Sequence, residues 1–143
     1  MLARPGEPNR SFGLDIATGK RLWTIEPAVG GDFNVPTVVV DGARLVLASE
    51  NNGTRIHLLD ANGHAGAEPA GSSPDLAPDT HSPVIVNGFV VGVWNDLFAL
   101  RLDDEFQTVH SLPDNAFFAN TSLIAGPDRV LALSEQGELL LVG

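Results

Sequence analysis

A three-part pattern repeats along this 143-residue chain and limits the folds that it can adopt. Each copy consists of an apolar run, a short polar turn and a second apolar run. The turns are Asp41-Gly42, Asn87-Gly88 and a looser turn at Gly126 to Asp128. Asp-Gly and Asn-Gly turns tolerate the positive φ angles of a tight hairpin, so the pattern predicts paired antiparallel strands. The copies lie about 46 and about 39 residues apart, a spacing typical of repeated supersecondary units.

A third strand is expected after each pair. These strands are predicted at residues 54–59, 97–102 and 138–142, and the first two end on a Leu-Asp pair that leads into a fourth strand. A unit of four antiparallel strands every 40 to 45 residues or so is the signature of a β-propeller blade. The alternative all-β fold is a β-sandwich, which also has short strands and regular turns but gives no reason for the repeat. The prediction is therefore an all-β chain of propeller blades, with no significant helix.

The predicted blades do not complete a ring. Residues 1–10 are expected to be disordered or extended, 11–27 to form half a blade, 35–73 and 81–113 to form whole blades, and 120–143 to form an incomplete last blade. This makes about three and a half blades, whereas closed propellers have at least four. The apolar flanks must then be covered by further blades or by a second copy. A homodimer would make a six-bladed ring if each copy gave its N-terminal outer strand to the last blade of the other and the first third-strand segment were left over.

The segment from Leu14 to Trp23 carries a motif that recurs more weakly downstream. It reads Leu-Asp-Ile-Ala-Thr-Gly-Lys-Arg-Leu-Trp. It resembles the quinoprotein-like (PQQ-like) β-propeller repeat, whose pattern is roughly Leu-Asp-x-x-Thr-Gly-Lys-x-x-Trp. The resemblance implies that the outer-strand Trp23 packs over a glycine-containing turn of the neighbouring blade. It implies a structural, blade-docking role for the motif residues Asp15, Thr18, Gly19, Lys20 and Trp23.

The resemblance also bears on function. The family's dehydrogenases hold pyrroloquinoline quinone (PQQ) and calcium with Glu, Asn and Asp, use an Asp base and commonly have adjacent cysteines. None of these motifs is matched here, and the chain has no cysteine. We therefore expect no enzymatic activity and no cofactor, with PQQ and calcium suggested by the resemblance alone. Non-catalytic relatives, such as outer-membrane assembly lipoproteins, imply a scaffold that binds protein or peptide. The alternatives are a fragment of a PQQ-dependent dehydrogenase-like protein and a calcium- or carbohydrate-binding module.

One predicted blade carries a candidate ligand rim. The loop before Pro83 and the turn around Asn95 border the same edge of that blade. The candidate residues are Asp79, His81, Trp94, Asn95 and Asp96. A carboxylate, an imidazole and an amide can hold a divalent cation or a polar ligand. The plain interpretation is that Asp and Asn are ordinary turn residues, because no fixed ligand spacing is present.

Charge and composition exclude some partners. The chain has 18 acidic and 8 basic residues, a formal net charge of −10. Nucleic acids and anionic membranes are not expected partners, because binding phosphates needs clustered Lys and Arg. The first ten residues lack the apolar run of a signal peptide, and no transmembrane segment is predicted. Relatives of the repeat family are often periplasmic or exported, so the compartment stays open.

Overall fold

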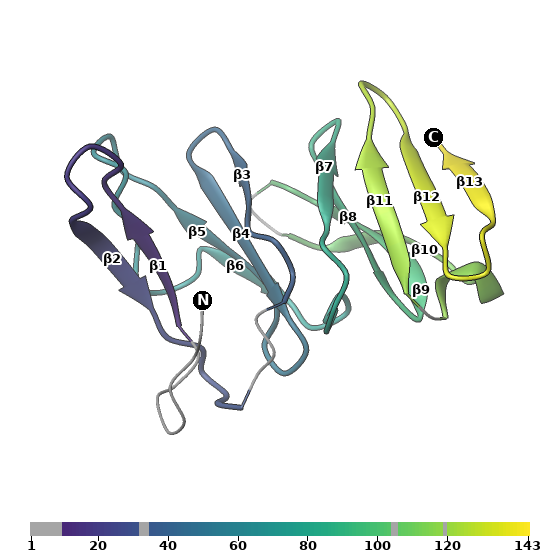
Figure 1. Ribbon diagram of the computed structural model, residues 1–143, viewed down its shortest axis with the longest axis horizontal. Helices are drawn as coiled ribbons and strands as arrows, with labels where there is room; N and C mark the ends of the chain where they lie inside the picture. The colour runs from purple at the N-terminus through teal and green to yellow at the C-terminus, as the bar shows by residue number, and fades with distance from the viewer. Residues whose placement is uncertain (1–9, 32–34, 104–105, 119) are drawn as a thin grey trace.

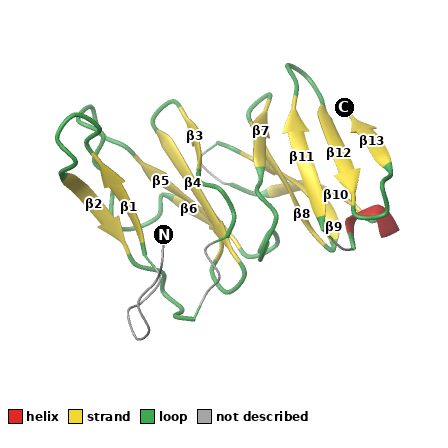
Figure 2. Cartoon of the chain, in the orientation of Figure 1, coloured by secondary structure: helices red, strands yellow, loops and turns green. Residues whose placement is uncertain are grey.

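Short strands make up nearly all the regular structure of this chain. The computed structural model describes residues 10–31, 35–103, 106–118 and 120–143. Residues 1–9 of the predicted disordered or extended segment lie outside these described residues. In Figures 1 and 2 the strands form a row of small antiparallel sheets, with one short 3-10 helix beside the last of them. No helix of the described ranges is long and apolar enough to cross a membrane.

The strands of the described residues gather into four sheets, each built from strands that follow one another in the sequence. The first sheet contains β1 (Ser11–Leu14) and β2 (Arg21–Ile25). The second contains β3 (Val39–Asp41), β4 (Arg44–Ser49), β5 (Gly53–Leu58) and β6 (Gly71–Ser73). The third contains β7 (Val84–Val86), β8 (Phe89–Trp94), β9 (Asp96–Arg101) and β10 (Thr108–Leu112). The fourth contains β11 (Thr121–Ala125), β12 (Val130–Ser134) and β13 (Leu139–Val142), and η1 (Asn115–Phe117) precedes it.

The sheets stand side by side like propeller blades. Their first strands, called inner strands here, contact one another in sequence order: β7 touches both β3 and β11. Within the described residues the row does not close into a ring. The predicted all-β fold of blade-like sheets is therefore confirmed, and the alternative of a two-sheet sandwich is wrong.

The hairpin turns follow from the residues that the repeat places there. Gly42 has a φ of 57°, and Asn87 and Gly88 have φ values of 50° and 79°. These left-handed conformations are open to Gly and Asn at little steric cost. The third copy turns differently, through a hydrogen bond of 2.8 Å from the Gly126 N–H to the carbonyl of Arg129.

The core consists of layers between successive sheets. Alternate residues of a strand point to opposite faces, so one strand serves two layers. In β8, Val90 belongs to the layer shared with the second sheet, and Val91 to the layer shared with the fourth sheet. A smaller layer of Ile25, Leu45 and Leu47 joins the first two sheets. The middle sheets are thus apolar on both faces.

The Gly- and Pro-rich segment 65–80 departs from its expected character. The sequence indicates a loop that tolerates insertions, with a short outer strand at residues 66–71. The strand lies instead at β6, and Leu76 beyond it is fully buried between the second and third sheets. The Leu76 carbonyl accepts a hydrogen bond of 2.6 Å from the Thr54 hydroxyl. The side-chain methyl groups of Leu76 fill the space over Gly92, where an added Cβ would lie 2.7 Å from the nearer methyl group. The end of this segment is therefore core.

We predict that Leu76→Ala lowers the free energy of unfolding by about 2–5 kcal/mol, because it removes buried methyl groups and leaves a cavity. Leu58→Ala makes the same chemical change on a half-exposed side chain and is expected to cost well under half as much. The midpoints of urea unfolding, measured at unchanged slope, compare the two variants. Equal losses would contradict the assignment of Leu76 to the core.

Candidate functional site

The predicted motif residues build the turn between β1 and β2. The Asp15 carboxylate accepts hydrogen bonds from the Thr18 hydroxyl at 2.6 Å and from the Thr18 N–H at 2.8 Å. These bonds hold the pKa of Asp15 below its ordinary value. Gly19 follows with a φ of 69°, and the Lys20 N–H donates to Thr18 Oγ1 at 3.3 Å. All of these contacts are local, so the turn shapes the hairpin.

Trp23 joins the first sheet to the second. Its indole N–H donates a hydrogen bond of 2.9 Å to the carbonyl of Gly63, in the turn that follows β5. The ring covers Gly13 on the neighbouring strand, and an added Cβ there would collide with it. Trp23 also packs against the layer that contains Leu45 and Leu47. The indole therefore fixes hairpin β1–β2 on the face of the next sheet.

The structure describes the surroundings of three residues of the candidate ligand rim. Trp94 packs against the core layer between the second and third sheets. Asn95, with a φ of 62°, and Asp96 open instead on a shallow hollow of about 570 Å³ beside η1, which Asp79 and His81 do not line. Among the residues that the structure describes, no group of three or more His, Asp or Glu side chains could hold a metal ion.

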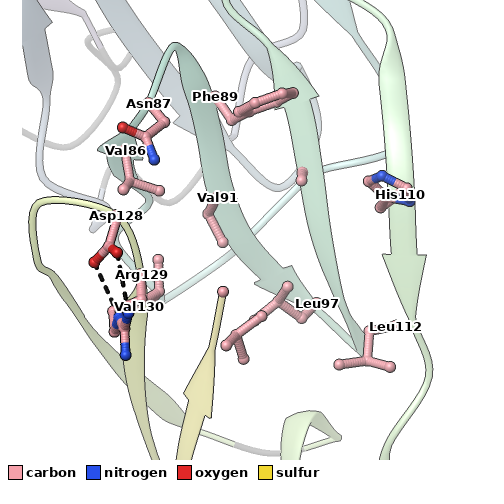
Figure 3. A pocket seen from close by; sticks show the side chains of 13 residues that line it. Val86, Asn87, Phe89, Val91, Leu97, His110, Leu112, Asp128, Arg129 and Val130 are labelled. Carbon is pink, nitrogen blue, oxygen red and sulfur yellow. Dashed lines mark hydrogen bonds and ion pairs between the residues drawn. The ribbon is translucent and has the colours of Figure 1, made fainter.

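A groove lies between the third and fourth sheets, and we call it the outer groove (Figure 3). Its volume is about 470 Å³, and apolar side chains of β8, β9 and β10 form much of its wall. They include Phe89, Val91, Leu97, Ala99 and Leu112. The fourth sheet closes the other side with Val130 and Val142.

The charged groups at the mouth of the outer groove satisfy each other. Arg129 donates to the Asp128 carboxylate from Nε at 2.9 Å and from a terminal nitrogen at 3.0 Å. This pairing lowers the pKa of Asp128 and raises the pKa of Arg129. His110 and Asn87 complete the polar part of the lining. The groove suits an apolar side chain better than a charged one.

Among the described residues, no strand follows β13 in the fourth sheet to cover the outer groove. In the part of the chain that the structure describes, β13 pairs with β12 alone. The Ser134 N–H donates a hydrogen bond of 2.9 Å to the Glu138 carbonyl, so Ser134 and Glu138 form a hydrogen-bonded pair. Along β12 and β13, hydrogen-bonded pairs alternate with pairs that share no hydrogen bond. In such an antiparallel pair, the backbone N–H groups of Leu139 and Leu141 point away from β12. β13 therefore offers a free strand edge beside an apolar groove.

The sequence matches no family model and no curated protein. Its fold is similar to that of a solved structure, the crystal structure of the computationally designed Ika4 protein. The TM-score is 0.70 at 10% sequence identity, over 92% of this chain and 79% of the designed one. At this identity the similarity shows the fold alone. The chain is thus an all-β protein of propeller-like blades.

The sequence did not point to the outer groove as a site. The wall of the outer groove consists of alternate apolar residues of three strands. In the sequence, this pattern looks the same as that of any strand face that packs in the core. The one available signal was the missing fourth strand of the last blade, which predicts an uncovered face next to it. The side chains of that face could not be chosen without the register of β8, β9 and β10.

His57 is buried in β5, and its surroundings favour the neutral ring. Its Nδ1 lies 2.9 Å from the Gly66 carbonyl, so Nδ1 carries the proton and donates it. Nε2 is buried with no hydrogen-bond partner among the described residues. Burial lowers the pKa of His57 below its ordinary 6.5, outweighing the bond to Gly66. We therefore assign His57 a structural role, in which its neutral ring is buried and donates a hydrogen bond to the Gly66 carbonyl.

We predict that Trp23→Ala frees hairpin β1–β2 while the other sheets stay folded, because a two-stranded hairpin is marginal without such an anchor. Hydrogen exchange should show loss of protection in β1 and β2 and unchanged protection in β8. Phe118→Ala removes an aromatic ring that is exposed and is expected to leave both regions unchanged. Full protection of β1 and β2 in the Trp23 variant would contradict the anchoring role.

We predict that His57 makes the protein less stable as the pH falls below about 6.5. The unfolded histidine takes up a proton there, whereas the buried one stays neutral until its lower native pKa is reached, so stability rises with pH across this window. His57→Asn should flatten that rise, and the same change at the exposed His110 should not. Urea unfolding between pH 5 and 7, around the ordinary histidine pKa, measures the slopes. An equal slope in all three proteins would disprove the assignment.

Proposed function

We propose that this chain is a non-enzymatic propeller segment of the quinoprotein-like repeat type that binds an extended strand of a protein or peptide. The single observation behind the proposal is the outer groove beside the free edge of β13. The bound strand would continue the fourth sheet at the position that β6 and β10 occupy in the second and third sheets.

In strand addition, a bound peptide pairs with an exposed strand edge, and β13 and the outer groove provide the groups that this mode of binding needs. The free backbone groups of Leu139 and Leu141 can pair with the main chain of an added strand, which supplies affinity. Alternate side chains of that strand would face Val91, Leu97 and Leu112 in the outer groove, which supplies specificity. An unpaired strand edge is a template for pairing with another chain, and the apolar wall beside it offers a surface for the side chains of that chain.

The repeat-family assignment draws on the motif hairpin. The Asp15–Thr18 turn and the Trp23 contact with Gly63 agree with the docking role that the family resemblance implies. The proposal of a binding platform draws on a rigid row of sheets that presents one groove without requiring a reactive group.

The strand-addition proposal predicts that blocking the edge abolishes peptide binding. Chains tethered singly at low density are exposed to a phage-displayed library of random peptides, and enriched peptides should alternate apolar and polar residues. Leu141→Pro removes an edge N–H without removing a bond to β12 and should reduce binding at least about tenfold. Leu141→Ala shortens the same side chain, keeps the N–H and should bind normally. Failure to enrich peptides, or equal binding by the proline variant, would overturn the proposal.

The non-enzymatic assignment has its own test. The melting temperature of the protein is expected to stay unchanged with calcium, with PQQ, or with both, because a bound ligand would raise it. Stabilisation by calcium and PQQ together would overturn the scaffold proposal and favour a fragment of a PQQ-dependent dehydrogenase-like protein. Stabilisation by calcium alone would favour the metal- or carbohydrate-binding module.

A further inference from the structure

We infer that Asn87 is a modification site, at which the folded chain deamidates spontaneously and the mouth of the outer groove gains a negative charge. The inference goes beyond the proposed function, because the site would convert whether or not the groove holds a strand. It follows from a comparison of the three Asn-Gly pairs of the chain, which are Asn52-Gly53, Asn62-Gly63 and Asn87-Gly88. The structure holds these pairs in different ways.

Deamidation at an Asn-Gly pair is an attack of the main chain on the side chain. The glycine nitrogen loses its proton to the solvent and bonds to Cγ of the asparagine, and the side-chain amide takes up a proton and leaves as ammonia. Water then opens the resulting cyclic imide. Opening at Cγ gives aspartate, and opening at the main-chain carbonyl gives isoaspartate, so water is consumed and ammonia is released. Glycine favours the attack because it has no Cβ to hinder the approach of its nitrogen.

The attack needs two free groups, the glycine N–H and the side-chain amide of the asparagine. A hydrogen bond that holds either group has to break before the nitrogen reaches Cγ. Each such bond slows the attack by roughly 2- to 12-fold, which is the rate equivalent of a typical net hydrogen bond. The hydrogen bonds of the folded chain therefore rank the pairs.

The Asn52-Gly53 pair is held at both residues. The Asn52 side chain accepts a hydrogen bond of 2.9 Å from the Val29 N–H and donates one of 3.0 Å to the Val29 carbonyl. Gly53 is buried at the start of β5, where an added Cβ would collide with the Ser73 carbonyl. The main chain has little room to turn here, so we expect the slowest conversion at this pair.

The Asn62-Gly63 pair is held at its main chain. The Gly63 N–H, which is the attacking group, donates a hydrogen bond of 3.0 Å to the Asp60 carbonyl. The Asn62 N–H donates one of 2.8 Å to the Asp60 carboxylate, and the Gly63 carbonyl accepts the bond from the Trp23 indole. The Asn62 residue itself is exposed. The fixed main chain therefore slows the conversion of this pair.

The Asn87-Gly88 pair is the least restrained. Both residues are exposed in the turn between β7 and β8. Within the described part of the chain, neither the Asn87 side chain nor the Gly88 N–H forms a hydrogen bond. The Gly88 carbonyl accepts one of 2.8 Å from the Leu102 N–H, but this carbonyl takes no part in the attack. A Cβ added at Gly88 would meet no atom within 4 Å, so the turn lies in open space. Both reacting groups of this pair are therefore free.

Conversion at Asn87 would change the charge of the outer groove. Asn87 lines the groove together with Asp128 and Arg129, whose opposite charges are paired (Figure 3). A carboxylate at position 87 would give this part of the lining two carboxylates for a single guanidinium. The balanced mouth of the groove would become negative. Isoaspartate would in addition lengthen the main chain of the β7–β8 turn by a methylene group.

Peptide mapping of the natural chain tests the order of the three pairs. The folded protein is incubated at mildly alkaline pH and digested, and the aspartate and isoaspartate forms of each peptide are quantified by mass spectrometry. The rate at each pair is divided by its rate in guanidinium chloride, where all three pairs are exposed. This ratio should be highest at Asn87, lower by roughly 2- to 12-fold or more at Asn62, and lowest at Asn52. A ratio at Asn62 or Asn52 that equals or exceeds the ratio at Asn87 would overturn the inference.

A matched pair of variants tests the change of charge. Asn87→Gly and Asn62→Gly each remove a reacting amide and leave a Gly-Gly pair, which suits tight turns. The natural chain should accumulate an acidic form on ion-exchange chromatography, and Asn62→Gly should accumulate it at nearly the same rate. Asn87→Gly should lose most of it while its circular dichroism spectrum stays unchanged. Equal accumulation in Asn87→Gly and in the natural chain would overturn the inference, and the peptide map decides the question if this variant does not fold.

Discussion

The structure depends on one packing constraint: each sheet has two apolar faces, and a neighbouring sheet must cover each face. Val90 and Val91 are adjacent in β8, yet they belong to different core layers. A sheet at the end of the described row leaves one of these faces partly uncovered. The outer groove, the exposed aliphatic side chains of the fourth sheet and the free edge of β13 all arise where the described row of sheets ends.

The junctions between sheets are filled in different ways. Between the first two sheets, a single indole spans the gap and reaches the Gly63 carbonyl. Between the second and third sheets, Leu76 and Phe106 come from connections outside the regular strands and fill the space. Between the third and fourth sheets, Phe117 of η1 enters the layer, and the outer half of the junction stays open. The open half is the place where a partner can add contact area.

The sequence was most informative where the local residue pattern determines the geometry. Gly42 and Gly88 mark hairpins because their φ angles are positive, and the repeat spacing predicted blade-like sheets correctly. Leu76 was misjudged because the glycines and prolines around it indicate a loop, whereas its burial depends on two sheets that are distant in sequence. The candidate ligand rim was predicted from residues that are near one another in sequence, which does not fix the direction of their side chains. Alternation along β8 turns Trp94 toward a core layer, and the turn carries Asn95 and Asp96 to a different hollow.

The order of strands within each sheet has a consequence for how the chain comes apart. Every sheet forms from consecutive strands and touches mainly its nearest neighbours, so the molecule approximates a one-dimensional array of coupled units. In such an array, units with two neighbours are held more firmly than units with one. Unfolding of an isolated chain would then begin at the terminal hairpin and at the terminal three-stranded sheet and progress inward. Closing the array into a circle removes both starting points, and cooperativity would rise because no unit is left with a single neighbour.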